Sequence, residues 1–186
     1  SPYGETFTGE GTYYGEIPAS AGNCAIQELP SMYSGMIPVA INGPQYNNAM
    51  MCGACIEGTG SGNGSGSNPI TGTFKAFVSD QCPECAWGDL DFAQSGDGRW
   101  EIEWQFVPCE GGGNPTFNFE GSNAYYWKIQ PVGTISPVNE LFVNGKLGQK
   151  TDDNFWIVEE GGPFYGEQVV ETNTILSGYY TNMVAL

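Results

Sequence analysis

Six cysteines, all within the first 109 residues of a 186-residue chain, constrain this sequence more than any other feature. The chain also contains 28 glycines and has no long runs of helix-forming residues. An even number of cysteines in a glycine-rich chain is typical of a disulfide framework formed in an oxidising compartment. We therefore expect three disulfides and a secreted, extracellular protein. The six are Cys24, Cys52, Cys55, Cys82, Cys85 and Cys109.

The spacing of four of these cysteines leaves a second interpretation open. Cys52–Cys55 and Cys82–Cys85 form a CxxC…CxxC pattern, which in a cytosolic protein would predict a four-thiolate zinc site. Zinc would leave Cys24 and Cys109 as free thiols, so disulfides are favoured. A thioredoxin-like redox motif is excluded because no helix-forming segment follows Cys85.

Short apolar runs between turn residues predict an all-β protein. Most of the runs show the period-two alternation of half-buried strands. The only helix we expect is a very short one at 47–51, and the Gly/Ser-rich run 58–68 is expected to be a flexible hairpin connection. The expected strands include 73–78, 100–107, 117–119, 125–130 and 155–158.

A glycine-rich stretch at 110–115 directly follows the last cysteine and marks the expected domain boundary. Residues 1–110 would form a disulfide-stapled domain. Residues 111–186 contain no cysteine and must depend on packing alone. The second part is shorter than a typical β-sandwich domain.

The charge balance excludes several classes of partner. The chain has 21 acidic and 5 basic residues, no histidine and a net charge of −16. Scattered cations cannot neutralise a phosphate backbone or an anionic membrane surface, so neither nucleic acid nor membrane is expected as a partner. The same charge repels acidic polymers. No run of eighteen apolar residues is present, and the first residues lack the features of a signal peptide, as in a mature secreted form.

The segment 78–92 carries the highest density of candidate functional residues. Asp80 stands at the end of an expected strand, and Asp89 and Asp91 follow a Cys-Pro turn on one side of an extended stretch. A strand end followed by a tight disulfide loop is a rigid support for a carboxylate. The alternative is that such an aspartate only caps the turn, which for a single aspartate is the favoured interpretation.

The same segment resembles the signature of the expansins, particularly the microbial ones. The resemblance rests on residues 78–85 (VSDQCPEC) and 88–92 (GDLDF). Further matching motifs are 11–15 (GTYYG), 52–55 (CGAC), 104–109 (WQFVPC) and the stretch from Asn118 to Gln130. Together they span nearly the whole chain in the order of the family. Expansins use their cysteines as disulfides, which makes zinc a minor alternative.

The resemblance implies an all-β fold, a six-stranded double-psi β-barrel at 1–110 followed by a small immunoglobulin-like β-sandwich at 111–186. The barrel is shared with family-45 glycoside hydrolases, which need an acid and a base carboxylate about 6.5–9.5 Å apart for inversion. Asp91 matches the acid, but Gly15 stands at the position of the base, as in expansins, which also lack it. Glu16 or Glu10 would have to act as an irregular base if the chain were an inverting endo-β-1,4-glucanase.

The resemblance also implies a row of aromatic residues that binds polysaccharide. Tyr125 and Tyr126 match two positions of this row, and the third is Asp153. Trp156 or Trp127 is expected to replace the third ring, although strand alternation makes one of the two a core residue. Cys82 stands where many microbial expansins have a tyrosine.

We predict from these observations an expansin-like protein that loosens cell-wall polysaccharide without hydrolysis, acting as a monomer on cellulose or cellulose–xyloglucan junctions. Asp91 would be the central polar residue, supported by Asp80, Thr12 and Tyr14, and Tyr125, Tyr126 and Trp156 would bind the polymer. No cofactor and no metal are expected. A pure carbohydrate-binding protein with a vestigial barrel groove is the third alternative. The predicted disulfides are Cys24–Cys52, Cys55–Cys109 and Cys82–Cys85.

Overall fold

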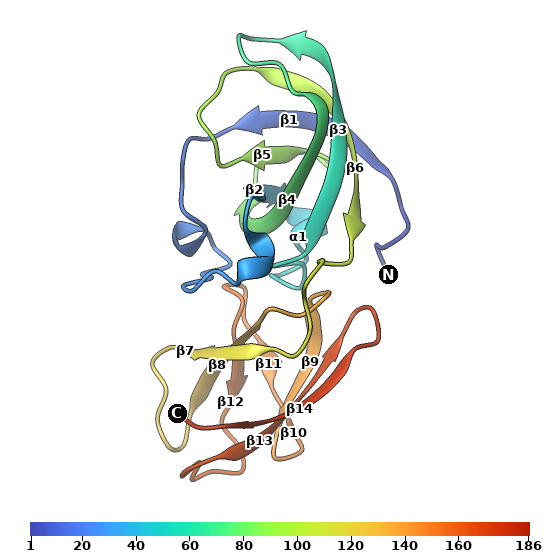
Figure 1. Cartoon of the computed structure of the whole chain (residues 1–186). Coiled ribbons are helices and arrows are strands. Elements are labelled where there is room, and N and C mark those ends of the chain that lie inside the picture. Colours follow the sequence, from blue (N-terminus) through green and yellow to red (C-terminus); the bar gives the residue numbers. More distant parts are fainter.

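The computed structural model describes all residues 1–186 and shows a β-barrel above a β-sandwich (Figure 1). The barrel closes in the order β1-β5-β2-β4-β3-β6. Two of its pairs, β1 with β5 and β2 with β4, are parallel, and the other pairs are antiparallel. Its strands are β1 (Phe7–Tyr13), β2 (Ile37–Asn42), β3 (Cys55–Ser65), β4 (Thr71–Cys82), β5 (Leu90–Phe92) and β6 (Arg99–Val107).

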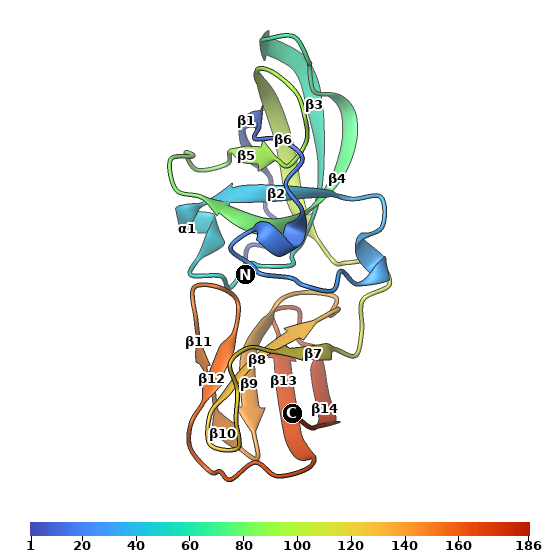
Figure 2. The same ribbon diagram turned by 90° about the vertical axis from the view of Figure 1, so that its left-hand side faces the viewer.

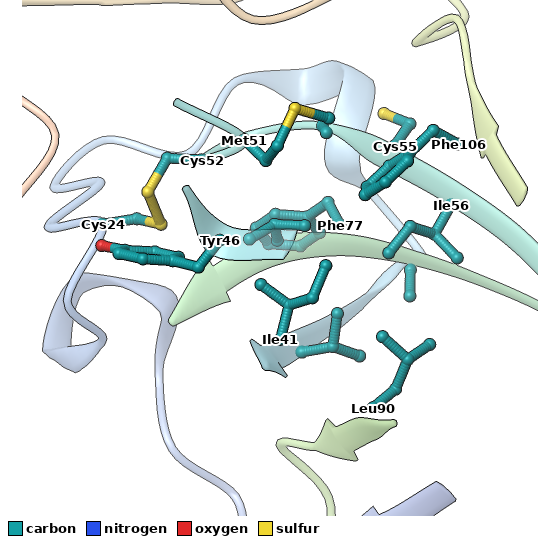
Figure 3. Packing of buried hydrophobic residues seen from close by; sticks show 14 of the residues in the cluster. Cys24, Ile41, Tyr46, Met51, Cys52, Cys55, Ile56, Phe77, Leu90 and Phe106 are labelled. Carbon is teal, nitrogen blue, oxygen red and sulfur yellow. A yellow bond between two sulfur atoms is a disulfide. The ribbon is translucent and has the colours of Figure 1, made fainter. Parts of the chain in front are cut away.

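The barrel interior is filled by side chains from all six strands. On β6, alternate residues are buried and the residues between them are exposed, as the period-two pattern predicted. Figure 3 shows Ile41, Ile56, Phe77 and Leu90 meeting across the interior. The barrel is therefore a packed core, and any binding surface must lie on its outside.

All three predicted disulfides are present. Cys24–Cys52 and Cys55–Cys109 join residues 28 and 54 positions apart, and Cys82–Cys85 closes a turn of three. No cysteine is free, so neither CxxC pair has thiolates to offer a zinc ion. The Cys55–Cys109 disulfide connects the first residue of β3 to the segment that directly follows β6.

Two local predictions were wrong. The helix is α1 (Gly43–Tyr46), which begins four residues before the expected segment, because the Asn42 side chain caps it and Pro44 occupies its first turn. Two further single turns are the 3-10 helices Ala19–Ala21 and Ser31–Tyr33. No helix is long and apolar enough to cross a membrane.

The Gly/Ser-rich run 58–68 belongs mostly to β3 and is not a flexible connection. A side chain at Gly58 would lie 2.4 Å from the Phe74 ring, and one at Gly60 would lie 2.3 Å from the carbonyl oxygen of Ile70. Glycine is therefore required here for the close packing of strands.

The sandwich consists of two four-stranded sheets, ordered β10-β9-β13-β14 and β11-β12-β8-β7. Its own core includes Trp127, Ile129, Leu141 and Trp156. No strand crosses the expected division near residue 110, whose exact place stays a prediction. The strands are β7 (Thr116–Phe119), β8 (Trp127–Val132), β9 (Val138–Val143), β10 (Lys146–Leu147), β11 (Gln149–Lys150), β12 (Trp156–Val158), β13 (Gln168–Thr174) and β14 (Tyr179–Val184).

A buried glutamine joins the sandwich to the barrel. The Gln130 Nε2 atom donates to the carbonyl oxygens of Cys24 at 3.0 Å, Ala25 at 3.3 Å and Asn154 at 3.2 Å. The Asn154 Nδ2 atom donates to the same Cys24 carbonyl at 3.0 Å. Because these groups are buried, the relative orientation of the two parts is fixed by hydrogen bonds as well as by packing.

We expect Gln130→Leu to lower the free energy of unfolding by about 2–4 kcal/mol, because buried carbonyl groups would lose their donor. Urea denaturation followed by tryptophan fluorescence measures the change. Gln149→Leu is the control, since Gln149 is exposed on β11 and should shift stability by less than about 0.5 kcal/mol. Equal effects of the two substitutions would contradict the role given to Gln130.

Candidate functional site

Thr12 and Asp91 form the centre of the candidate site on the barrel. They lie opposite each other on the parallel strands β1 and β5. The Thr12 hydroxyl donates to Asp91 Oδ1 at 2.9 Å. The parallel pairing thus brings together two residues that are 79 positions apart in the sequence.

The surroundings of Asp91 favour its protonated form. Burial raises the pKa of Asp91, and the nearby carboxylates of Glu84 and Asp80 raise it further. The bond from Thr12 and the charge of Arg99 act in the opposite direction and do not cancel the effect. A partly buried carboxyl group that retains its proton more readily is suited to donate a hydrogen bond or a proton.

Tyr14 and Asp80 extend this cluster. Burial raises the pKa of the Tyr14 hydroxyl to about 12, and the charges of Asp80 and Asp91 contribute to the rise. Asp80 also has a structural role, because its Oδ1 atom accepts the backbone N–H groups of Asn23 and Gln81, both at 2.8 Å. Asp80 therefore anchors the loop before Cys24 as well as facing Tyr14.

Asp89 acts as a cap. Its two carboxylate oxygens accept the backbone N–H groups of Glu10 at 2.9 Å and Ala86 at 3.0 Å. For this residue the turn-capping alternative holds, because both oxygens are used to fix the loop between Cys85 and β5.

Gly15, the residue expected at the position of the family-45 base, has a φ of +96° and no side chain that could supply a carboxylate. Of the two irregular candidates, Glu10 is paired with Arg99 at 2.6 Å, and Glu16 is an exposed residue just after β1. Glu16 is thus the unpaired one of the two.

Tyr125 and Tyr126 lie in a tight turn before β8, although the sequence pattern predicted strand from residue 125 onward. The Tyr125 side chain is 61% exposed, and Tyr126 is partly buried. The turn is closed by Asn123, whose Oδ1 atom accepts the Tyr125 N–H at 2.8 Å. At least one aromatic ring is therefore presented to solvent at this place.

The prediction that Trp156 contributes to the binding face was wrong. Trp156 is 3% exposed and Trp127 is fully buried, and both belong to the sandwich core. The two strands pair with Trp156 opposite Ile129 and Val158 opposite Trp127. Both tryptophans therefore point to the same inner side, and neither replaces a third exposed ring.

A cluster of charges occupies the third position instead. The Lys128 Nζ atom lies 2.9 Å from Asp153 Oδ2 and 2.8 Å from Glu120 Oε1, and 4.9 Å from the centre of the Phe155 ring. Burial raises the pKa of Asp153, but hydrogen bonds from Thr151 and Lys128 outweigh it and lower the pKa overall. This part of the surface is therefore polar, and its charges are paired.

A chain of hydrogen bonds connects the barrel cluster to the sandwich. The Asn23 Nδ2 atom donates to the Tyr46 hydroxyl at 2.8 Å and to the Asp152 carbonyl at 2.7 Å. Tyr46 donates to the same carbonyl at 2.8 Å. In Figure 2 the β11–β12 loop, which carries Asp152, reaches the barrel beside α1. No sequence motif marked Asn23, Tyr46 or Lys128, so their roles were missed.

Two solved structures of the Clavibacter michiganensis expansin share this fold. A mutant form in complex with cellohexaose gives a TM-score of 0.77 at 22% sequence identity, over 96% of this chain and 90% of that chain. The apo form gives a TM-score of 0.76 at 21% identity with the same coverage. No family model and no curated protein matches the sequence. The predicted fold class, a double-psi barrel followed by a β-sandwich as in expansins, is confirmed.

We expect Thr12→Val to raise the pKa of Asp91 further, because the hydroxyl donor stabilises the carboxylate form. A carboxyl-carbon NMR titration of the wild type and the variant measures the change. Thr8→Val, at an exposed position of the same strand, is the control and should leave the titration of Asp91 unchanged. If both variants titrate like the wild type, the Thr12–Asp91 bond does not form in solution.

Proposed function

We propose that this chain is a secreted, expansin-like protein that binds a neutral β-linked glucan such as cellulose and loosens its non-covalent contacts without cutting it. Cellulose–xyloglucan junctions of plant-type walls are the proposed point of action, and the protein would act as a monomer. Three disulfides agree with an extracellular site of action.

The observation that carries this proposal is the raised pKa of Asp91 together with the absence of a side chain at Gly15, the expected position of the base. Asp91 is also hydrogen-bonded to Thr12, and its raised pKa suits donation to a glycosidic or hydroxyl oxygen. Inverting hydrolysis also needs a base to activate water, and Gly15 offers none. A lone acid can compete for the hydrogen bonds of a glucan, but it has no partner to complete hydrolysis.

Binding to a neutral glucan is supported by three further features. Tyr125 exposes a ring that can stack on the flat apolar face of a pyranose. The net charge of −16 disfavours anionic polymers. The complex of the Clavibacter expansin with cellohexaose supports a β-linked glucan as the ligand of this fold.

One observation favours a second candidate function, an inverting endo-β-1,4-glucanase. The raised pKa of Asp91 is also the property of a general acid, and Glu16 is exposed and unpaired on the chain that follows Tyr14. Release of soluble sugar separates this candidate from the proposed function.

Asp91→Asn tests the proposal directly. The substitution retains size and removes the charge and the acidic proton, so we expect weakening of cellulose paper or wall strips to be lost while cellulose binding persists. Extension of strips under load measures the first property, and a depletion isotherm measures the second. The control is Asp97→Asn, at an exposed aspartate that bonds to the β3–β4 hairpin, which should retain full activity.

The same experiment includes a reducing-end assay. We expect no soluble sugar from the wild type. Removing a general acid costs about 10²–10⁴-fold in rate, so sugar released by the wild type and lost in Asp91→Asn would establish the glucanase instead. Unchanged wall weakening by Asp91→Asn would show that Asp91 is not needed and would favour a carbohydrate-binding protein with a vestigial barrel groove.

Combined substitution of Tyr125 and Tyr126 by alanine should weaken cellulose binding by about 1–3 kcal/mol, since each ring loses one stacking contact. Depletion isotherms at low and moderate salt provide the measurement. Binding of the wild type should depend weakly on salt, because a neutral polymer carries no charge to screen. An unchanged isotherm in the double variant would place the binding face elsewhere.

A further inference from the structure

Tyr165, in the loop between β12 and β13, is an exposed ring whose backbone is held in place. Its side chain is 71% exposed, more than that of the other large apolar residues at the surface. The preceding residue, Phe164, is buried and packs against Trp127 with ring centres 5.2 Å apart. The Gln168 Nε2 atom donates to the Tyr165 carbonyl at 2.8 Å. Phe164 thus packs in the sandwich core, whereas the neighbouring Tyr165 ring lies mostly in solvent.

The same loop is bonded to the turn that carries Tyr125. The Phe164 N–H donates to the Ala124 carbonyl at 2.6 Å. A side chain at Gly162 would lie 2.9 Å from that carbonyl oxygen and 3.4 Å from the Tyr125 Cα atom, so glycine permits the close approach. Tyr125 and Tyr165 each directly follow one of the two bonded residues. Tyr125 and Tyr165, the two most exposed aromatic residues of the sandwich, therefore lie on adjacent segments.

The charges around this loop are mostly negative. Glu159, Glu160 and Glu167 are exposed, and the loop itself carries no cation. A surface hollow at the start of the loop is lined by Glu159 and Glu160 together with one cation, Lys146. Carboxylates accept hydrogen bonds from hydroxyl groups and repel anions, while aromatic rings contact flat apolar faces. A neutral, polyhydroxylated chain of pyranose units has both kinds of group.

We propose that Tyr165 and Tyr125 together form a stacking site for a β-linked pyranose chain at the end of the sandwich away from the barrel, with Glu159 and Glu160 accepting bonds from its hydroxyls. Figure 1 shows the β12–β13 connection at the lower end of the sandwich, opposite the barrel. The site would lengthen the binding surface beyond the Tyr125–Tyr126 turn. It rests on the proposed function and adds a contact to it.

The test compares Tyr165→Ala with Tyr165→Phe and with Tyr179→Ala. Tyr179 is the matched control because it is a 58% exposed tyrosine on β14, in the other sheet. Titration calorimetry with cellohexaose and depletion isotherms on cellulose measure binding. We expect Tyr165→Ala to weaken binding about threefold to tenfold, and the other two variants to bind within about twofold of the wild type.

Urea midpoints of Tyr165→Ala and Tyr165→Phe should match the wild type, because the Tyr165 ring is mostly exposed. If the wild type binds and Tyr165→Ala binds equally well, the inference is wrong and the proposed function stands. If Tyr179→Ala weakens binding as much as Tyr165→Ala, the effect is not specific to this end of the sandwich and the inference is again wrong. If the wild type binds neither glucan, the proposed function and the inference fail together.

Discussion

The backbone carbonyl of Cys24 is the point at which the two halves of the molecule are joined. It accepts hydrogen bonds from Gln130 and Asn154 of the sandwich, while the Cys24–Cys52 disulfide holds the same residue to the barrel. The Cys24 N–H donates to the Ser79 carbonyl at 3.1 Å, one residue before Asp80. A displacement of this segment would therefore move Asp80 and the sandwich together. The geometry of the candidate site thus depends on a structural link at Cys24, which lies outside the site itself.

The fixed link has a consequence for the chemistry of the site. Asp91 and Tyr14 lie on the barrel, and the exposed tyrosines lie on the sandwich, with the bonded residues Asn23 and Asp152 between them. A protein with a flexible hinge would lose binding free energy in ordering its two halves on a ligand. Here the two halves are already joined by hydrogen bonds in the folded chain, so a ligand that touched both halves would not have to order them.

Most of the fold, but only part of the site, could be predicted from the sequence. The resemblance carried by the ordered motifs was sufficient for the barrel and the disulfide pairs, while alternation alone predicted parts of β4 and β6, at 73–78 and 100–107. The glycines at 58 and 60 were misleading, because composition does not distinguish a flexible loop from a strand packed too closely for side chains. Trp156 was wrongly predicted to lie on the surface, because alternation defines the two faces of a strand but does not indicate which of them faces the core. Tyr165 had no signal at all, since its exposure depends on the burial of Phe164.

The Lys128 cluster replaces the expected third aromatic contact with paired charges. Lys128 is only 17% exposed at its side chain and is bonded to both Glu120 and Asp153, so its charge is neutralised where an aromatic contact is otherwise expected. Under the proposed function, a glucan gains little free energy by displacing groups that are already paired with one another. The contacts that add net binding free energy would then come from the barrel cluster and from the exposed tyrosines, and the paired charges of Lys128 would add little.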